Sequence, residues 1–191
     1  EFNVSNALAA VGIAAALDLD MAATADALAS VPAVPGRLEV IADEPLVLRD
    51  YAHTPDALQR ALGALRPSVK GRLIVVFGCG GDRDPGKRPL MGRAAAAAAD
   101  YSVVTSDNPR SEPPEAVIAD ILPGLGGAAH EVIVDRRAAI ARALELAGAD
   151  DVVLLAGKGH EDYQIIGDAR RPFDEAAIVS ELLGERPGGS R

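Results

Sequence analysis

The sequence predicts an α/β fold built on a doubly wound, mostly parallel sheet with helices on both faces. Short apolar runs and amphipathic stretches alternate between residues 46 and 156, which is typical of successive β-α-β units. Two of the runs, Leu73–Phe77 and Val152–Ala156, are apolar throughout, as expected of strands buried on both faces. Because crossovers between parallel strands are right-handed, the helices should cover both faces in a Rossmann-like arrangement.

The beginning of the chain has a different pattern. Residues 3–30 are rich in alanine, and apolar residues recur there at helical spacing. Asp20 is placed to cap a second, short helix within this segment. Residues 31–36 contain two prolines and a glycine, which indicates a linker. We therefore expect a helical unit at residues 1–34 and an α/β domain at residues 35–185.

Local patterns predict the remaining elements of the α/β domain. A helix at 55–65 has a clear start, because Thr54 can cap it and Pro55 fits its first turn. Strands are predicted at 38–41, 46–51, 73–77, 101–105, 132–134 and 152–156, with a short edge strand at 163–166. Further helices are predicted at 88–99, 114–122, 136–147 and 175–182. The tail at residues 186–191 is expected to be disordered.

Composition argues against several classes of protein. The 191 residues carry a net charge of -9, which disfavours a surface for nucleic-acid phosphates. No uncharged apolar run reaches about 18 residues, so we expect no membrane span, and no signal peptide is visible. The single cysteine, Cys79, fits a reducing cytoplasm. Because the chain starts at Glu1 without an initiator methionine, we expect a piece of a longer protein.

Polar, glycine-bearing loops follow four of the predicted strands. They are residues 50–56, 78–88, 106–110 and 157–161. In open parallel sheets the ligand lies at the carboxyl ends of the strands, so all four loops should open on the same edge. Chance would scatter such loops over both edges. Their shared position is therefore the main indication of a site.

The charges in these loops indicate the kind of ligand. Arg83 and Arg110 can pair with carboxylates, and Asn108 can both donate and accept hydrogen bonds. Glu161 can bind an ammonium group, and the carbonyl of Gly157 can accept another donor. Cationic and anionic groups in one crevice suit a zwitterion such as an amino acid. A network of ion pairs between neighbouring loops is the alternative, and the convergence of four loops favours the ligand.

Two nucleotide-binding motifs are matched only in part. Residues 81–88 nearly fit a P-loop between a strand and a helix, but Arg88 replaces the Ser or Thr that would hold magnesium. Residues 78–80 are similar to the start of a dinucleotide fingerprint, yet the third glycine would fall at Arg83. Cys79 fits a packing residue better than a nucleophile, and no His–Cys spacing fits a metal site.

Several collinear segments resemble the Mur ligase family, and within it the enzymes that add meso-diaminopimelate to a peptidoglycan precursor. The matching motifs are Asp50–Asp56, Gly78–Asp84, Lys87–Met91, Asp107–Arg110 and Gly157–Glu161. Asn3–Leu8 and Pro35–Arg37 match the end of the family's central domain and its linker. The resemblance covers residues 2–184 and implies the last of three domains, preceded by the closing helices of the second.

The resemblance implies an ATP-dependent peptide-bond ligase. In the family, ATP phosphorylates the γ-carboxyl group of the D-glutamyl residue of UDP-MurNAc-L-Ala-D-Glu, and the amine of diaminopimelate attacks the acyl phosphate. The residues implied to hold diaminopimelate are Arg83, Asp107, Asn108, Arg110, Gly157 and Glu161. Lysine-adding relatives lack the arginine of the Asp-Asn-Pro-Arg motif. This agrees with a role for Arg110 at the second carboxylate of diaminopimelate.

The resemblance also implies contacts with ATP. Asn3 and Asn6 correspond to positions near adenine, Arg37 to a phosphate contact and Asp50 to a ribose contact, with His53 close by. ATP and Mg²⁺ would be bound mainly by a central domain outside this chain, and no catalytic residue or metal ligand is assigned here. We therefore expect this chain alone to be inactive. A stand-alone amino-acid-binding module and a P-loop-like nucleotide hydrolase are the alternatives.

Overall fold

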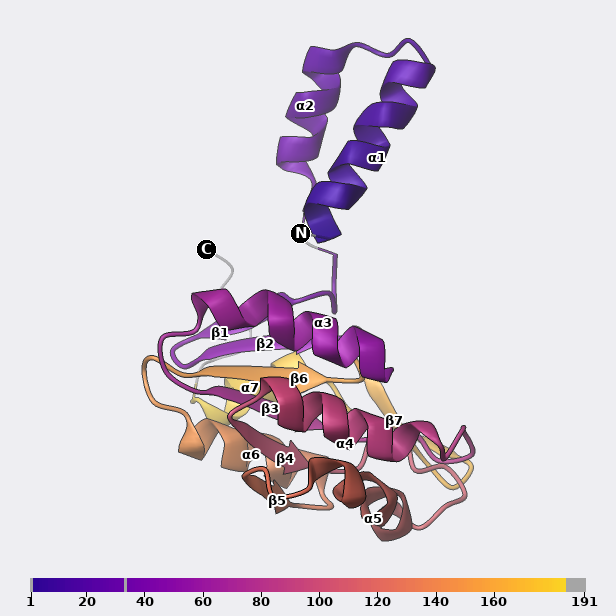
Figure 1. Cartoon of the computed structure of the whole chain (residues 1–191), viewed down its shortest axis with the longest axis vertical. Coiled ribbons are helices and arrows are strands. Elements are labelled where there is room, and N and C mark those ends of the chain that lie inside the picture. The colour runs from indigo at the N-terminus through magenta and orange to yellow at the C-terminus, as the bar shows by residue number, and fades with distance from the viewer. Residues whose placement is uncertain (1, 33, 185–191) are drawn as a thin grey trace. The chain divides into compact units, whose positions relative to one another are not determined.

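The computed structural model describes residues 2–32 and 34–184, which divide into two compact units after Val34 (Figure 1). The first unit is a pair of helices, α1 (Phe2–Ala16) and α2 (Met21–Ser30). Helix α2 begins directly after the predicted cap, Asp20. Oδ1 of Asp20 accepts the backbone N–H groups of Ala22 and Ala23 at 2.8 and 2.9 Å. The predicted helical segment is thus confirmed.

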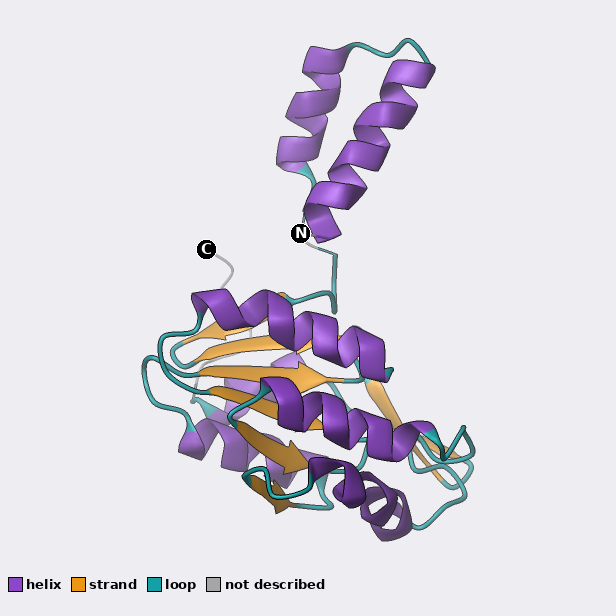
Figure 2. Ribbon diagram, in the orientation of Figure 1, coloured by secondary structure: helices purple, strands orange, loops and turns teal. Residues whose placement is uncertain are grey.

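The second unit contains a six-stranded sheet in the order β1-β2-β6-β3-β4-β5 (Figure 2). Only the first pair, β1 (Glu39–Asp43) and β2 (Leu46–Asp50), is antiparallel. The other neighbours are parallel. These strands are β3 (Leu73–Phe77), β4 (Tyr101–Val104), β5 (His130–Val132) and β6 (Val152–Ala156). The predicted mostly parallel sheet is therefore confirmed.

Helices cover both faces of the sheet. One face carries α3 (Pro55–Leu65), α4 (Lys87–Ala98) and α5 (Pro114–Leu125), and the other carries α6 (Arg136–Leu146) and α7 (Glu175–Leu182) (Figure 1). A short 3-10 helix, η1 (Arg66–Ser68), follows α3. The two layers of helices give the predicted doubly wound α/β fold.

The strands divide their side chains between two hydrophobic cores. On β3, Leu73, Val75 and Phe77 face the core under α3, α4 and α5, while Ile74 and Val76 face the core under α6 and α7. All five side chains are fully buried. The two-residue alternation of a strand explains why a strand between two helical layers must be apolar throughout.

Three elements differ from the sequence-based expectation. The strand predicted at 132–134 is His130–Val132, because the chain then leaves the ladder, although Ile133 N–H still donates to the carbonyl of Val104 at 3.0 Å. Helix α5 continues past its predicted end, through Pro123. The short edge strand predicted at 163–166 is present as β7 (Tyr163–Ile166), but it forms a separate two-stranded sheet with an unpredicted strand, β8 (Ala169–Pro172).

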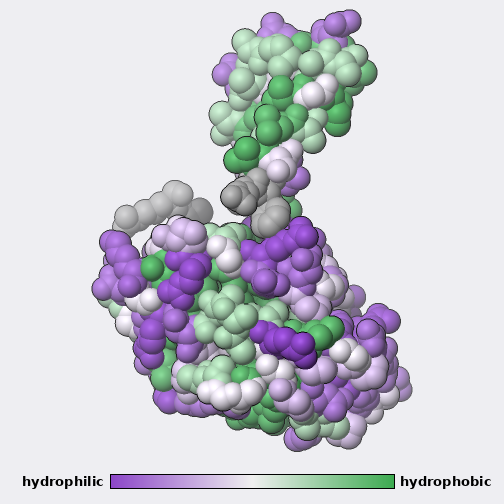
Figure 3. Space-filling model, viewed as in Figure 1, coloured by the Kyte–Doolittle hydropathy of each residue, from purple (hydrophilic) through white to green (hydrophobic). Residues whose placement is uncertain are grey.

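Large apolar side chains remain exposed on the helical unit, which the space-filling view shows as a green surface (Figure 3). They include Val4, Leu8, Ile13, Leu17, Leu19 and Met21. Among the described residues, no helix combines the length and apolar character needed to cross a bilayer. The tail predicted to be disordered, residues 186–191, lies outside the described residues.

Candidate functional site

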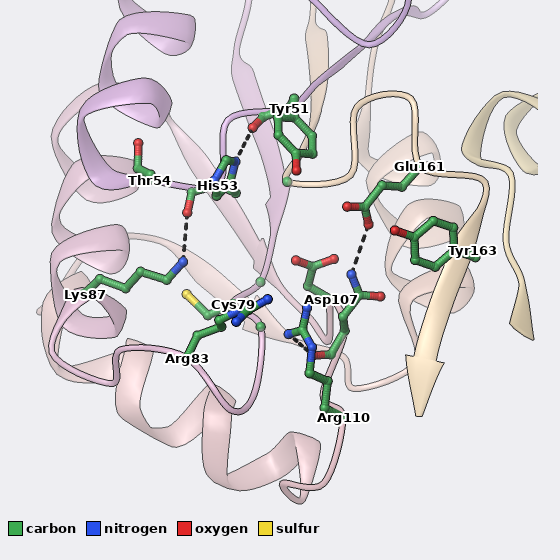
Figure 4. Close-up of a pocket in the computed structure, with 14 residues that line it drawn as sticks. Tyr51, His53, Thr54, Cys79, Arg83, Lys87, Asp107, Arg110, Glu161 and Tyr163 are labelled. Atoms are coloured by element: carbon green, nitrogen blue, oxygen red, sulfur yellow. Dashed lines mark hydrogen bonds between the residues drawn. The ribbon is translucent and has the colours of Figure 1, made fainter. Parts of the chain in front are cut away.

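A pocket of about 410 Å³ lies where four strands of the main sheet end (Figure 4). Its lining comes from the segments after β2, β3, β4 and β6, and from the start of β7. The lining residues are Tyr51, His53, Thr54, Gly78, Cys79, Gly80, Arg83, Lys87, Asp107, Asn108, Arg110, Gly157, Glu161 and Tyr163. All six residues expected to hold an amino acid are therefore brought together, as is His53 from the expected nucleotide set.

Close backbone approach explains one glycine of the pocket, and a positive φ explains a second. A Cβ atom on Gly78 would clash with the carbonyl oxygen of Thr105, so the ends of β3 and β4 can meet only around a residue without a side chain. Gly157 has a φ of 115°, which favours glycine, and its N–H donates to the carbonyl of Asp50 at 3.0 Å. The first contact joins the ends of β3 and β4, and the second joins the ends of β2 and β6.

Asn108 and Glu161 are held in a buried hydrogen-bond network. Asn108 Oδ1 accepts from Lys158 Nζ at 3.1 Å and from the N–H of Ile165 at 2.9 Å. Asn108 Nδ2 donates to Glu161 Oε2 at 3.0 Å. Lys158 Nζ also donates to the carbonyl of Tyr163 at 2.8 Å. The amide and the carboxylate are thus positioned before any ligand arrives.

Asp107 is buried beside this network. Lys158 Nζ lies 3.3 Å from Asp107 Oδ1, an ion-pair distance, yet this oxygen has no hydrogen bond of good geometry within the described residues. The backbone carbonyl of Asp107 accepts from Gln164 Nε2 at 2.6 Å, and the same amide donates to Ser106 Oγ at 3.0 Å. Oδ1 of Asp107 is therefore buried against the ammonium group of Lys158.

Arg110 is fixed by the β7–β8 hairpin. Its backbone has a φ of 52°, which is unusual for a residue with a side chain. Its N–H donates to the carbonyl of Ile165 at 3.1 Å, and its carbonyl accepts from Gly167 N–H at 2.7 Å. Nη1 of its guanidinium donates to the carbonyl of Gly81 at 2.8 Å. The other guanidinium donors remain able to pair with a carboxylate.

The opposite side of the pocket is held by fewer contacts. Arg83 is exposed and, within the described residues, has neither an ion pair nor a hydrogen bond. Lys87 Nζ donates to the carbonyl of His53 at 3.1 Å. Burial raises the pKa of the Cys79 thiol to about 12, so this thiol is protonated at neutral pH and does not act as a nucleophile. Figure 4 shows the guanidinium groups of Arg83 and Arg110 turned toward the same space as the Asp107 and Glu161 carboxylates.

The residues expected to contact ATP are only partly gathered at the pocket rim. The guanidinium of Arg37 lies 5.1 Å from the ring centre of Tyr51, and the ring of His53 lies 4.6 Å from it. Asp50 is buried, and its Oδ2 accepts the N–H of Leu38 at 2.8 Å. Burial raises the pKa of the Asp50 carboxyl, and the hydrogen bond from Leu38 opposes this shift.

The two asparagines of the expected nucleotide set belong to the helical unit. Asn6 is exposed on α1. Asn3 lies in the first turn of the same helix, and its side chain is outside the described part of the chain.

The loop at residues 81–88 does not offer the open N–H groups of a P-loop. Gly81 N–H donates to the carbonyl of Asn108 at 2.9 Å, and Asp82 N–H donates to Glu112 Oε1 at 2.6 Å. Arg88, at the position where a P-loop has a Ser or Thr, is buried and pairs with Glu112 at 2.7 Å. Since a P-loop binds phosphate through free backbone N–H groups, this geometry argues against nucleotide hydrolysis here.

The described residues contain no cluster of three or more His, Cys, Asp and Glu side chains that could hold a metal ion.

The important residues that sequence reasoning left undecided or missed are Lys158, Gln164 and Tyr163. Lys158 lies between two glycines directly after a fully apolar strand, and this was the one available signal of a buried role.

The chain is similar to known ligases. Residues 36–159 match the family described as "Mur ligase, glutamate ligase domain". A UDP-N-acetylmuramoyl-L-alanyl-D-glutamate--2,6-diaminopimelate ligase from Gloeobacter violaceus is 54% identical over 190 residues, covering 97% of this chain and 39% of the relative. The chain therefore spans well under half the length of that protein.

Solved structures agree with this similarity. A structure of UDP-N-acetylmuramoyl-L-alanyl-D-glutamate--2,6-diaminopimelate ligase matches with a TM-score of 0.76 and 46% identity, over 96% of this chain and 38% of that one. A folylpolyglutamate synthase from Mycobacterium tuberculosis, complexed with ADP and AMPPCP, matches with a TM-score of 0.63 and 25% identity, over 89% of this chain and 36% of that one.

Proposed function

The chain belongs to the Mur ligase family, and on that premise we propose that it is the amino-acid-binding part of an ATP-dependent ligase that joins meso-diaminopimelate to UDP-MurNAc-L-Ala-D-Glu. One observation carries the proposal. Two guanidinium groups, from Arg83 and Arg110, and two carboxylates, from Asp107 and Glu161, line one pocket. This is the pattern of charges that a free amino acid requires.

Meso-diaminopimelate fits this pocket better than a simpler amino acid. It carries a carboxylate at each end, whereas lysine carries only one. Arg110 has guanidinium donors left after its contact with the carbonyl of Gly81, so it can bind the second carboxylate. The carboxylates of Glu161 and Asp107, which both line the pocket, can accept hydrogen bonds from an ammonium group. With lysine, the charge of Arg110 would have no partner in the ligand, which disfavours its binding.

In the proposed reaction this chain acts by binding and orienting the amine. The nitrogen of diaminopimelate forms a bond to the acyl carbon of the D-glutamyl phosphate, the bond from that carbon to the phosphate oxygen breaks, and inorganic phosphate leaves. The neutral amine loses a proton in the same step, and the departing phosphate takes it up. A fixed pocket converts this encounter of two molecules into an oriented attack, which is a large contribution to rate. When bound, ATP supplies the phosphoryl group of the acyl phosphate.

We propose that Arg37, Asp50 and His53 form the part of the rim that faces ATP. Arg37 and His53 lie beside the Tyr51 ring and are exposed, so they are accessible to a phosphate. The described residues do not fit a site for Mg²⁺, because they include no cluster of suitable ligands. We propose no role for them in holding that ion. We infer that the reaction takes place in the cytoplasm, as expected for an enzyme that uses ATP.

Calorimetric titration of the complete ligase that carries this chain tests the proposal. We expect saturable binding of meso-diaminopimelate and much weaker binding of L-lysine. Arg110→Ala should weaken the binding of meso-diaminopimelate by about 10- to 100-fold, because a charge-assisted hydrogen bond is lost. It should change the binding of L-lysine little. Equal affinity for the two amino acids, or no effect of Arg110→Ala, would contradict the proposal.

A further inference from the structure

Lys158 is a fully buried cation behind the wall of the pocket. Its side chain is 0% exposed, and it is not among the lining residues. Its ammonium group donates to Asn108 Oδ1 at 3.1 Å and to the carbonyl of Tyr163 at 2.8 Å. It therefore connects the loop after β4 with the loop after β6 and with the start of β7, without being able to touch a ligand.

The position of Lys158 determines which way the Asn108 amide faces. An ammonium group can only donate, and the backbone N–H of Ile165 can only donate, so both require the amide oxygen of Asn108 on their side. The amide nitrogen must then face the pocket, where it donates to Glu161 Oε2 at 3.0 Å. With Lys158 removed, the Asn108 oxygen keeps only one of its two donors, the Ile165 N–H, and the contact with Glu161 is the other constraint that remains.

Lys158 also balances the negative charge of the pocket. Its Nζ lies 3.3 Å from Asp107 Oδ1 and 3.9 Å from Glu161 Oε2. These are two of the groups that face the proposed ammonium ligand. A cation behind them reduces their mutual repulsion while it leaves the pocket side of both carboxylates free.

Fold stability alone does not account for this lysine. Burial lowers the pKa of Lys158, and the nearby Arg136 adds to this effect, although the charge of Asp107 opposes it. A buried charge is expensive to desolvate, and replacing a whole buried ion pair by apolar side chains of similar volume is often neutral or stabilising. A role in arranging the pocket explains why an ammonium group is present here.

We propose that Lys158 is a positioning residue for the amino-acid substrate, acting through the amide of Asn108 and the carboxylates of Asp107 and Glu161. This inference rests on the proposed function, because it assumes that these three groups hold meso-diaminopimelate. The contribution of Lys158 is indirect. It sets the pattern of donors and acceptors that the pocket presents, and the substrate meets only the groups it has arranged.

The test compares Lys158→Met with Lys70→Met, an exposed lysine outside the pocket, in the complete ligase. We expect Lys158→Met to raise the KM for meso-diaminopimelate by about tenfold or more, since the Asn108 amide and the two carboxylates lose their arrangement. The KM for ATP should change much less, although the melting temperature should fall because the carboxylate of Asp107 is left buried without its cation. Lys70→Met should change none of these. If Lys158→Met folds poorly, Lys158→Gln retains a donor for Asn108 and gives a smaller rise in KM.

A double-mutant cycle shows whether Lys158 acts through Asn108. In an Asn108→Ala background, Lys158→Met should raise the KM for meso-diaminopimelate by much less than it does in the wild type. Additive effects, an unchanged KM in Lys158→Met, or an equal rise in the KM for every substrate would overturn the inference. If the wild-type ligase does not use meso-diaminopimelate at all, the proposed function itself fails, and this result is distinguishable because it appears before any substitution.

Discussion

The two sides of the pocket are held in different ways. The β4–β6 side, residues 106–110 and 157–165, contains buried polar groups that bind one another, with Lys158 and Asn108 at their centre. The β2–β3 side, residues 51–54 and 78–87, presents Arg83 and His53, both exposed (Figure 4). The β4–β6 side is therefore the rigid side of the pocket, and the β2–β3 side is the adaptable side.

This difference indicates a division of tasks. A preorganised group gives selectivity, because a ligand that leaves a buried donor or acceptor unpaired loses binding energy. An exposed side chain contributes charge and can adjust its position as a ligand arrives, but it binds more weakly in contact with water. We therefore expect the β4–β6 side to decide which amino acid binds. The β2–β3 side should mainly strengthen the binding and respond to the other substrates.

A buried ion pair holds the backbone at the base of the β4–β6 side. Arg136 and Glu175 are both 0% exposed, and Arg136 Nε donates to Glu175 Oε1 at 2.8 Å. Arg136 Nη2 also donates to the carbonyl of Ala156 at 2.9 Å, and Nη1 contacts the carbonyl of Ser106 at 3.4 Å. Arg136 thus connects the ends of β4 and β6, from which the loops of this side of the pocket begin.

The largest expected effect comes from breaking this support. Arg136→Met leaves the carboxylate of Glu175 buried without its partner, so the free energy of unfolding should fall by about 3–5 kcal/mol. The neighbouring residue gives a matched control, because Arg137 pairs with Glu181 at the surface, where the two side chains are 41% and 69% exposed. Arg137→Met should lower the free energy of unfolding by at most about 1 kcal/mol. Urea denaturation of the three proteins measures both effects.

A double variant separates the ion pair from the backbone contacts. Arg136→Met combined with Glu175→Leu removes both charges, so most of the lost stability should return. The contacts of Arg136 with the carbonyls of Ser106 and Ala156 stay lost, so the affinity for meso-diaminopimelate should remain below that of the wild type. If the double variant bound this ligand as well as the wild type, the support of the β4–β6 side by Arg136 would be disproved.

A smaller effect is expected from the β2–β3 side. Arg83→Gln should weaken the binding of meso-diaminopimelate by about tenfold or less, because Arg83 is exposed and its attraction is screened by water and salt. The loss should shrink further as the salt concentration rises. Arg93→Gln, another exposed arginine outside the pocket lining, is the control and should have no effect. A loss larger than that in Arg110→Ala would reverse the comparison between the two sides.

The sequence alone predicted the sheet and the gathering of the four loops. Apolar strands such as Leu73–Phe77 are local signals, and the glycine-bearing loops after them follow from the rule that parallel strands end at one edge. The β4–β6 network was not predictable in this way. Lys158 and Asn108 are 50 residues apart, and Gly-Lys-Gly fits an exposed anion-binding turn equally well. Lys158 is buried against the β7–β8 hairpin, where it donates to the carbonyl of Tyr163. The second strand of this hairpin is charged and carries no clear strand pattern.

The smallest effect on the amino acid is expected from His53→Ala. Lys87 Nζ contacts the backbone carbonyl of His53, not its ring, so this contact survives the substitution. The ring is exposed and is held by Nδ1, which donates to the carbonyl of Tyr51 at 2.8 Å because a carbonyl can only accept. Loss of an exposed ring should change the free energy of amino-acid binding by about 0.5 kcal/mol, so the KM for meso-diaminopimelate should change by about twofold at most.

The same substitution should raise the KM for ATP, because we place His53 on the rim that faces the nucleotide. Steady-state kinetics with each substrate varied in turn measures both constants in one protein. His130→Ala, a change at a half-buried histidine outside the pocket, controls for the loss of an imidazole. A rise in the KM for meso-diaminopimelate alone would mean that the adaptable side also selects the amino acid. The division of tasks between the two sides would then be wrong, since an exposed residue with few contacts would be contributing selectivity.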